Sequence, residues 1–252
     1  MIFTNLIKTN LRTTQFGKDI EYYQRIDSTN SEAWELIKEN KASNGMIVIT
    51  DNQYEGKGRN NNKWFMSPSK GLAMSIILTN PFPVKTAKLI PLAAGVAAAK
   101  MLENRGAIPK LKWPNDIFIG NKKCGGILCE TKMSNNQIKS MVIGFGININ
   151  ENENDLPKEI INSSTSLSIE TGNSNQRELV CAILITYFEN LLMDIDSVRK
   201  NWQNYCYHLD QPISFSHNNL SYEGIFKGID KNGHAIIKIG NNLKNFPSII
   251  IE

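Results

Sequence analysis

The spacing of hydrophobic residues predicts alternating helices and strands in the first part of the chain. Apolar positions within 33–37 fit one face of a short amphipathic helix, for which Ser28 or Thr29 is a suitable N-cap. The runs 45–50 and 71–79 are almost continuously apolar and are therefore expected to form buried strands. These elements predict a sheet with at least one helix packed on it.

A second helix is expected at 84–104, where small Ala residues would allow close packing. Pro91 should begin or kink this helix, and Gly106 should end it. Further along, strands are expected at 111–119, 124–131 and 138–148, and helices at 176–195 and 197–208.

After Asp210 the pattern changes to short strands, expected at 212–215, 222–229, 234–239 and 246–251. Turns are expected at Asn218-Asn219, Asn232-Gly233 and Asn241-Asn242, and Asn-Gly is the strongest hairpin signal among them. Roughly 40 residues of short strands are typical of a small barrel. We therefore expect an α+β protein with a main domain at 1–208 and a small β-barrel at 209–252.

Length and composition agree with this division. The chain has 252 residues, which at roughly 150 per domain allows one large and one small domain. The net charge of +4 is too small to indicate nucleic acid as a partner. The longest apolar run, 90–99, is far short of a membrane span, and the N-terminus lacks the pattern of a signal peptide. We expect a cytoplasmic protein without a membrane partner.

Four cysteines and three late histidines do not form a disulfide framework or a zinc-ligand pattern, so reduced thiols are expected. The chain also contains 31 asparagines, so a motif that rests on one Asn carries less information here than usual. Motifs that contain Lys, Arg, Trp or Pro at fixed positions are therefore more informative in this chain.

The polar segment 53–64 joins two predicted strands and contains Gly56 and Gly58 together with cations, namely Lys57, Arg59 and Lys63. Glycines let a backbone approach an anion, and cations neutralise it. The alternative is a solvated basic loop. The segment fits neither the P-loop nor the dinucleotide-binding pattern, but a loop this long is usually functional or disordered.

Three further strings could carry chemistry. They are Lys112-Trp113-Pro114-Asn115-Asp116, Lys122-Lys123-Cys124-Gly125-Gly126-Ile127-Leu128 and Gly144-Phe145-Gly146-Ile147-Asn148. The alternatives without a function are, in the same order, a surface turn, a basic turn before an inner strand, and small residues at a core contact. The sequence contains no Gly-x-Ser-x-Gly and no plausible Cys/His pair, so any chemistry would depend on positioning and charge stabilisation.

Taken together, these strings resemble the biotin–protein ligases (biotin–acetyl-CoA-carboxylase ligases), here of the type without a DNA-binding domain. The resemblance runs from about Ile26 to the C-terminus. Its elements are Ser28-Thr29-Asn30, Gln53 with Gly56-Lys57-Gly58-Arg59 and Trp64, Lys112-Trp113-Pro114-Asn115-Asp116, Lys123 with Gly126-Ile127-Leu128 and Glu130, Gly144-Phe145-Gly146-Ile147-Asn148, and Thr165-Ser166-Leu167.

The resemblance implies a mixed sheet flanked by helices, similar to class II aminoacyl-tRNA synthetase cores, and an SH3-like C-terminal barrel. It implies ATP, Mg²⁺ and biotin as ligands, a biotinyl-5′-AMP intermediate, and a lysine of a biotin carboxyl carrier protein as acceptor. A homodimer is possible within the family. Because only about 25 residues precede Ser28, too few for a domain of ordinary size, a repressor that binds DNA is not expected.

The family's functional residues carry over position by position. Biotin would contact Ser28, Thr29, Asn30, Gln53, Lys57, Gly58, Arg59 and Lys123. ATP would contact Arg59, Trp64, Lys112, Asn115 and Asn148. The catalytic group would be Lys123, Arg59, Lys112 and Asp116, with Asn115 and Asp116 orienting either Mg²⁺ or the incoming lysine, and Asp116 as the metal ligand.

The sequence departs from the family in the segment 53–64, where Lys57 replaces the common Arg and Asn60-Asn61-Asn62 replaces a second Arg-Gly. Two rival functions remain at this point. A lipoate–protein ligase would share the fold, although the full Lys-Trp-Pro-Asn-Asp string and the late barrel favour biotin. A non-catalytic SH3-like module that binds nucleic acid would need a basic stripe, which residues from Asp210 onward lack.

Overall fold

The computed structural model describes residues 1–135, 137–218 and 220–251. Asn219, half of one expected turn, lies outside these residues. The helices are α1 (Thr4–Asn10), α2 (Thr29–Lys38), α3 (Val84–Ala87), α4 (Ile90–Asn104), α5 (Leu167–Thr171), α6 (Arg177–Met193) and α7 (Val198–Tyr205), with 3-10 turns η1 (Arg59–Asn61), η2 (Glu153–Asp155) and η3 (Ile195–Ser197). The strands are β1 (Ile20–Tyr23), β2 (Ile47–Thr50), β3 (Gly56–Lys57), β4 (Lys63–Trp64), β5 (Leu72–Leu78), β6 (Phe82–Pro83), β7 (Pro109–Lys112), β8 (Asp116–Ile119), β9 (Lys122–Ser134), β10 (Gln137–Ile147), β11 (Pro212–His217), β12 (Leu220–Ile229), β13 (Ala235–Ile239), β14 (Asn242–Phe246) and β15 (Ile250–Ile251).

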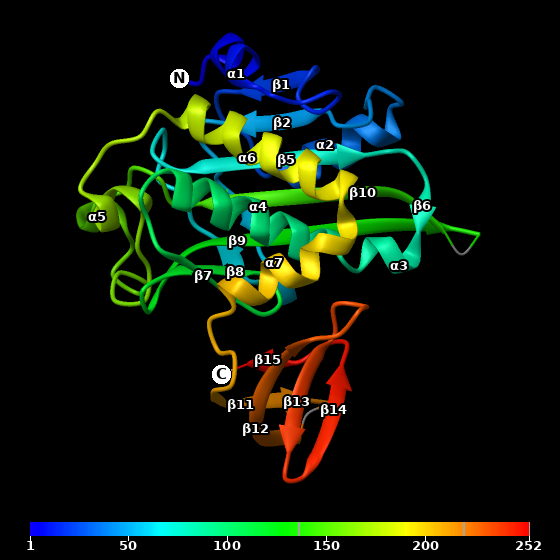
Figure 1. Cartoon of the computed structure of the whole chain (residues 1–252). Helices are drawn as coiled ribbons and strands as arrows, with labels where there is room; N and C mark the ends of the chain where they lie inside the picture. The colour runs from blue at the N-terminus through cyan, green and yellow to red at the C-terminus, as the bar shows by residue number, and fades with distance from the viewer. Residues whose placement is uncertain (136, 219, 252) are drawn as a thin grey trace.

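A mixed sheet forms the centre of the main part, in the order β1-β2-β5-β10-β9-β8-β7, with β6 paired to β10 (Figure 1). Strands β1 and β2 run parallel, and the other pairs are antiparallel. The longest strands, β9 and β10, lie side by side at the middle of the sheet. The expected α+β class with a mixed sheet and flanking helices is confirmed.

The two faces of this sheet differ because side chains alternate along each strand. On one face, α4, α6 and α7 cover a large core that includes Ile143 and Phe145 of β10 (Figure 1). On the other face, α2 covers a separate small cluster that includes Ile77 and Val142. The rest of this second face is not needed for a core and is free to form a site.

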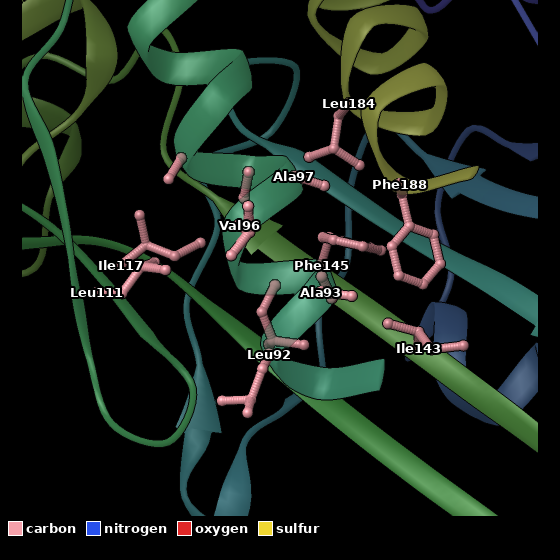
Figure 2. Packing of buried hydrophobic residues seen from close by; sticks show 14 of the residues in the cluster. Leu92, Ala93, Val96, Ala97, Leu111, Ile117, Ile143, Phe145, Leu184 and Phe188 are labelled. Atoms are coloured by element: carbon pink, nitrogen blue, oxygen red, sulfur yellow. The ribbon is translucent and has the colours of Figure 1, made fainter. Parts of the chain in front are cut away.

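Helix α4 packs closely on the sheet because one of its faces carries mostly small residues. Figure 2 shows Ala93 and Ala97 of α4 beside Phe145 and Phe188. The Phe145 and Phe188 rings meet edge to face, with centroids 5.7 Å apart. The predicted role of the Ala-rich helix in close packing is confirmed.

A five-stranded antiparallel sheet, in the order β14-β13-β12-β11-β15, follows the main part (Figure 1). It shares the main core, since Phe226 of β12 packs 6.3 Å from Trp202 of α7, measured between ring centroids. Its β12–β13 turn contains Gly233, whose φ of +79° suits glycine, as the Asn-Gly signal predicted. The Gly233 carbonyl also accepts a hydrogen bond from the Trp113 indole at 3.1 Å.

Three expected elements are interrupted in the structure, and a proline lies at or near each break. The strand expected at 111–119 is the hairpin β7–β8, because Pro114 has no N–H and cannot extend a ladder. The helix expected at 84–104 is α3 plus α4, and α4 has Pro91 in its first turn, where the missing N–H is not needed. The strand expected at 246–251 ends at Phe246, before Pro247, and resumes as β15.

Other differences are smaller. The pattern did not predict α1 and β1, and the polar segment 53–64 contains the short hairpin β3–β4 instead of a plain loop. The expected turn at Asn241-Asn242 lies one residue earlier, and Asn242 begins β14. Among the described residues, no helix is both long enough and apolar enough to cross a bilayer.

Candidate active site

A cavity of about 200 Å³ lies on the second face of the main sheet, over β9 and β10 and under the segment 53–64. The residues that line it include nearly all the candidates from the sequence. They are Ser28, Thr29, Asn30, Gln53, Lys57, Gly58, Arg59, Asn60, Asn62, Lys63, Trp64, Lys112, Trp113, Pro114, Asn115, Asp116, Lys123, Gly126, Ile127, Leu128, Gly144, Phe145, Gly146 and Ile249–Ile251. Of the predicted site residues, only Asn148 is outside this group.

Charge is distributed unevenly in the cavity. Five cationic side chains line it, from Lys57, Arg59, Lys63, Lys112 and Lys123. Among the described lining residues, Asp116 supplies the one carboxylate. These cations come from three separate parts of the chain, so the fold has concentrated positive charge that the sequence distributes widely, as an anion-binding site requires.

The glycines of β10 create the space for this cavity. A Cβ on Gly146 would lie 2.6 Å from the indole of Trp64, and a Cβ on Gly144 would overlap the Asn30 amide oxygen. The alternative of a core contact for these glycines is wrong, because they face the cavity and leave room for Asn30 and Trp64. The side chain of Phe145, between them, packs in the core against Phe188.

Buried polar side chains form one part of the cavity lining. Gln53 Oε1 accepts a hydrogen bond from the Thr29 backbone N–H at 2.9 Å and lies 3.3 Å from Thr29 Oγ1. Thr29 and Asn30 both contact Ser75 Oγ, at 2.7 and 2.6 Å. Because Thr29 and Asn30 are each 3% exposed and Ser75 is fully buried, these groups are fixed before a ligand arrives.

The segment 53–64 is held over the cavity by its own hairpin and by two side-chain contacts. Strands β3 and β4 pair Gly56 with Trp64. Lys57 Nζ donates to Ser31 Oγ at 2.7 Å, and Arg59 Nη1 donates to Asn115 Oδ1 at 2.9 Å. The Arg59 contact joins this segment to the Lys112–Asp116 turn. Two candidate strings that are distant in the sequence therefore meet at the same part of the cavity.

The Lys112–Asp116 turn is fixed on both sides. Asn115 exchanges backbone and side-chain hydrogen bonds with Ile127 of β9, at 2.9 and 3.1 Å. Trp113 is bonded to the Gly233 carbonyl of the second sheet. Lys123 Nζ, on β9, forms an ion pair with Asp116 Oδ1 at 2.7 Å. The turn therefore presents Asn115 and Asp116 beside Lys123.

Trp64 and Lys123 also border a second cavity of about 1160 Å³, which shares most of the segment 57–64 with the first. Asn148 lines this cavity and not the first. Its side chain donates to the Thr165 carbonyl at 2.9 Å, which joins two more of the matching strings. The indole Nε1 of Trp64 is buried without a hydrogen-bond partner among the described residues.

Ionisation of the nearby cysteines is disfavoured. Burial raises the pKa of the Cys129 thiol, with a further contribution from the Glu130 carboxylate. Burial also raises the pKa of Cys124. Both thiols therefore stay protonated near neutral pH, which agrees with the absence of a nucleophile pattern in the sequence.

Two parts of the site were missed in the sequence. Ser75 is the polar residue in the middle of an otherwise apolar buried strand, which is a signal that could have identified it. Ile249–Ile251 reach the cavity only because β15 pairs with β11 in the second sheet, and no local pattern predicts that position.

A metal site does not stand out from the side chains alone. The described residues contain no group of three or more His, Cys, Asp or Glu side chains arranged to hold an ion. Mg²⁺ is usually bound through one or two carboxylates together with substrate phosphates. A single carboxylate, such as Asp116, beside an anion-binding cavity fits that kind of site.

Comparisons with known proteins agree with the geometry. Residues 22–148 match the Biotin/lipoate A/B protein ligase family. The chain is 31% identical to the Bifunctional ligase/repressor BirA of Bacillus subtilis, over 98% of this chain and 77% of that protein. It is 26% identical to the Biotin--[acetyl-CoA-carboxylase] ligase of Paracoccus denitrificans, over 85% of this chain and 92% of that one.

The fold is similar to that of solved structures as well. The biotin protein ligase from Aquifex aeolicus in complex with biotin and ATP superposes with a TM-score of 0.78, at 24% identity, over 93% of this chain and 98% of that one. The matched region contains the strings that line the first cavity, from Ser28 to Gly146. The chain belongs to the biotin/lipoate A/B protein ligase family.

Proposed function

We propose that this protein is a biotin–protein ligase, which activates biotin with ATP and transfers the biotinyl group to a lysine of a biotin carboxyl carrier protein. The observation that carries the proposal is one cavity that is lined both by buried polar side chains and by five more exposed cations. The relative from Paracoccus denitrificans is named as a ligase that joins biotin to acetyl-CoA carboxylase, which favours biotin over lipoate.

In the first step, a carboxylate oxygen of biotin attacks the α-phosphorus of ATP. The bond from this phosphorus to the bridging oxygen breaks, pyrophosphate leaves, and biotinyl-5′-AMP forms. Two anions must approach each other, so positive charge is required at the point of contact. Lys123 is suited to stand between the carboxylate and the α-phosphate, and its ammonium can follow the charge as it moves.

The other candidate residues have roles that their positions support. Biotin's ureido ring would be held by the buried polar residues Ser28, Thr29, Asn30 and Gln53. Arg59, with Lys57 and Gly58, would close over the adenylate, and Lys112 would face the phosphates. Trp64 and Asn148 would contact the nucleotide from the second cavity.

In the second step, the lysine amine of the carrier attacks the biotinyl carbonyl carbon, AMP leaves, and the amine loses a proton. Asn115 and Asp116 lie where they could orient this amine. The same residues would hold Mg²⁺ through Asp116 and the substrate phosphates. When bound, Mg²⁺ neutralises charge on the phosphates.

The C-terminal sheet fits the family's SH3-like barrel, and the main sheet fits a core of the class II aminoacyl-tRNA synthetase type. We place the domain boundary between 208 and 209, just before β11. A cytoplasmic location suits a carboxylase partner. A homodimer remains compatible with the fold, and DNA binding is not part of this proposal.

Labelled biotin tests the function directly. The chain, ATP, Mg²⁺ and a carrier domain should give a labelled carrier, and a carrier with its acceptor Lys replaced by Arg should stay unlabelled. Mass detection of biotinyl-5′-AMP without carrier should isolate the first step. No label transfer to a carrier that another ligase can modify would exclude the proposal.

A further inference from the structure

Arg59 borders three cavities at once, which no other described residue does. It lines the first cavity of about 200 Å³ and the second of about 1160 Å³. It also lines a third cavity of about 280 Å³, which is bordered by the start of α4 and by the β12–β13 turn. Arg59 therefore lies where the three cavities meet, and its exact placement decides what surrounds a ligand in the first two.

One side-chain contact fixes the far end of Arg59. Its Nη1 donates to Asn115 Oδ1 at 2.9 Å. Asn115 is itself held by two hydrogen bonds with Ile127 of β9, one through its backbone at 2.9 Å and one through its side chain at 3.1 Å. Because the acceptor is fixed, the backbone that carries Arg59 determines whether the guanidinium reaches it.

That backbone belongs to a tight turn at residues 58–62, the tip of the segment 53–64. The turn is closed by two hydrogen bonds, from the Gly58 N–H to the Asn62 carbonyl at 2.7 Å and from the Asn62 N–H to the Arg59 carbonyl at 3.1 Å. Asn60, in the middle, is left-handed, with φ of 54° and ψ of 39°. Residues other than glycine rarely adopt this conformation, and asparagine is one of the few that tolerate it.

The Asn60 side chain itself does little in this turn. It is exposed and forms no hydrogen bond with another described residue, so its contribution comes through the backbone. The tip is also the place where Asn60-Asn61-Asn62 replaces the second Arg-Gly of the family, so this chain forms its turn without a second glycine. An unusual backbone conformation beside a binding site is a reason to look for a functional role.

We propose that Asn60 is a positioning residue, whose left-handed backbone directs Arg59 onto Asn115 and thereby sets how tightly the site holds the biotinyl-5′-AMP intermediate. This inference rests on the proposed function, in which Arg59 closes over the adenylate. If the turn forms only part of the time, the apparent affinity for the adenylate falls by the same fraction. The hairpin β3–β4 has two residues in each strand and is too short to impose the turn by itself.

Two substitutions of Asn60 separate its backbone from its side chain. Asn60→Val introduces a branched Cβ that disfavours the left-handed conformation, whereas Asn60→Gly removes the amide and favours that conformation. The probe is a stable biotinyl-5′-AMP analogue with an acyl sulfamate in place of the acyl phosphate, and its Kd is measured by competition calorimetry. We expect the Kd to rise about tenfold in Asn60→Val and to stay within about twofold in Asn60→Gly.

A double variant tests whether the effect passes through Arg59. Arg59→Ala should itself weaken binding of the analogue, and the addition of Asn60→Val to it should cause less than about a twofold further loss. A merely structural role of Asn60 would instead add its full loss in both backgrounds.

Asn40→Val is the matched control. Asn40 is another exposed asparagine with a left-handed backbone, with φ of 56°, and it follows α2 and lines none of the three cavities. The same change of side chain there should lower thermal stability but leave the Kd for the analogue unchanged.

The outcomes are distinct. Equal losses in Asn60→Val and Asn60→Gly would mean that the amide contacts the ligand, and a full loss in the Arg59→Ala background would mean that the tip acts without Arg59. Either result, or an unchanged Kd in Asn60→Val, would overturn the positioning inference while the proposed function stands. If the original chain binds neither biotin nor the analogue, the proposed function fails.

Discussion

Replacement of Lys123 by Ala should have a large effect on the first chemical step. Lys123 Nζ is paired with Asp116 at 2.7 Å, and both side chains line the cavity beside Asn115. If biotin and ATP meet here, this ammonium is the group that neutralises the repulsion between carboxylate and phosphate. Its removal also leaves Asp116 without its partner, so one uncompensated negative charge would face two anionic substrates.

The size of the effect follows from solvent access. Removal of a preorganised charge-stabilising donor from a closed site costs about 10²–10³ in rate. The Lys123 and Asp116 side chains are 36% and 28% exposed, so water screens this site in part. We therefore expect the lower end of that range, about a hundredfold loss, or about 3 kcal/mol of transition-state stabilisation.

Two assays locate the loss. Pyrophosphate release with biotin and ATP reports the first step and should fall about a hundredfold in Lys123→Ala. Transfer from preformed biotinyl-5′-AMP to the carrier should fall less, since the phosphate is then already joined to biotin. Lys123→Arg keeps the positive charge with a different geometry. Its rate of pyrophosphate release should lie between that of the original chain and that of Lys123→Ala. Near-normal pyrophosphate release by Lys123→Ala would refute the reasoning.

Three further predictions concern packing, pH and motion. Gly146→Ala should push Trp64 out of place, raising the KM for ATP in steady-state kinetics with little change in thermal stability; a normal KM would contradict the close contact. Burial raises the pKa of Glu151 to about 7, so its protonated form is favoured in the fold, and stability should decline as pH rises from about 4.5 to 7. In Glu151→Gln, the free energy of unfolding, measured by denaturant titration at each pH, should decline less over this range, by up to ~3 kcal/mol. A decline with pH as steep as that of the original chain would count against the prediction. The segment 53–64 should become resistant to protease when biotin and ATP are added, and equal cleavage with and without them would exclude ordering by ligand.

The sequence predicted most elements where local patterns are strong. Helix α6 was predicted from its apolar spacing, although in the structure it is buried on most sides and not along a single stripe. The β12–β13 turn follows from Asn232-Gly233. Two of the errors occurred where a proline lies inside a segment that was predicted as one strand. Strand β7 ends shortly before Pro114 and β14 ends just before Pro247, because proline has no N–H to continue a ladder and the spacing of apolar residues does not reveal that loss.

The site was predictable to the extent that it consists of short strings. Arg59, Lys112 and Lys123 line one cavity, as the sequence led us to expect. The contacts between strings were not predictable, since they depend on strand register. Gly144 pairs with Leu128 and Gly146 with Gly126, and a shift by one residue would turn Ile143 and Phe145 into the cavity.

The second sheet is part of the site's construction, although none of the strings from Ser28 to Asn148 belongs to it. Its β12–β13 turn holds Trp113 through the Gly233 carbonyl, and its last strand, together with Ile249 just before it, contributes to the cavity wall. On its other side, the Lys112–Asp116 turn is tied to Ile127 and Arg59 through Asn115. A turn that must present a cation, an amide and a carboxylate to moving anions needs support on both sides, because about 1 Å of misplacement is costly in catalysis. The small sheet supplies that support from the side that the main sheet leaves open.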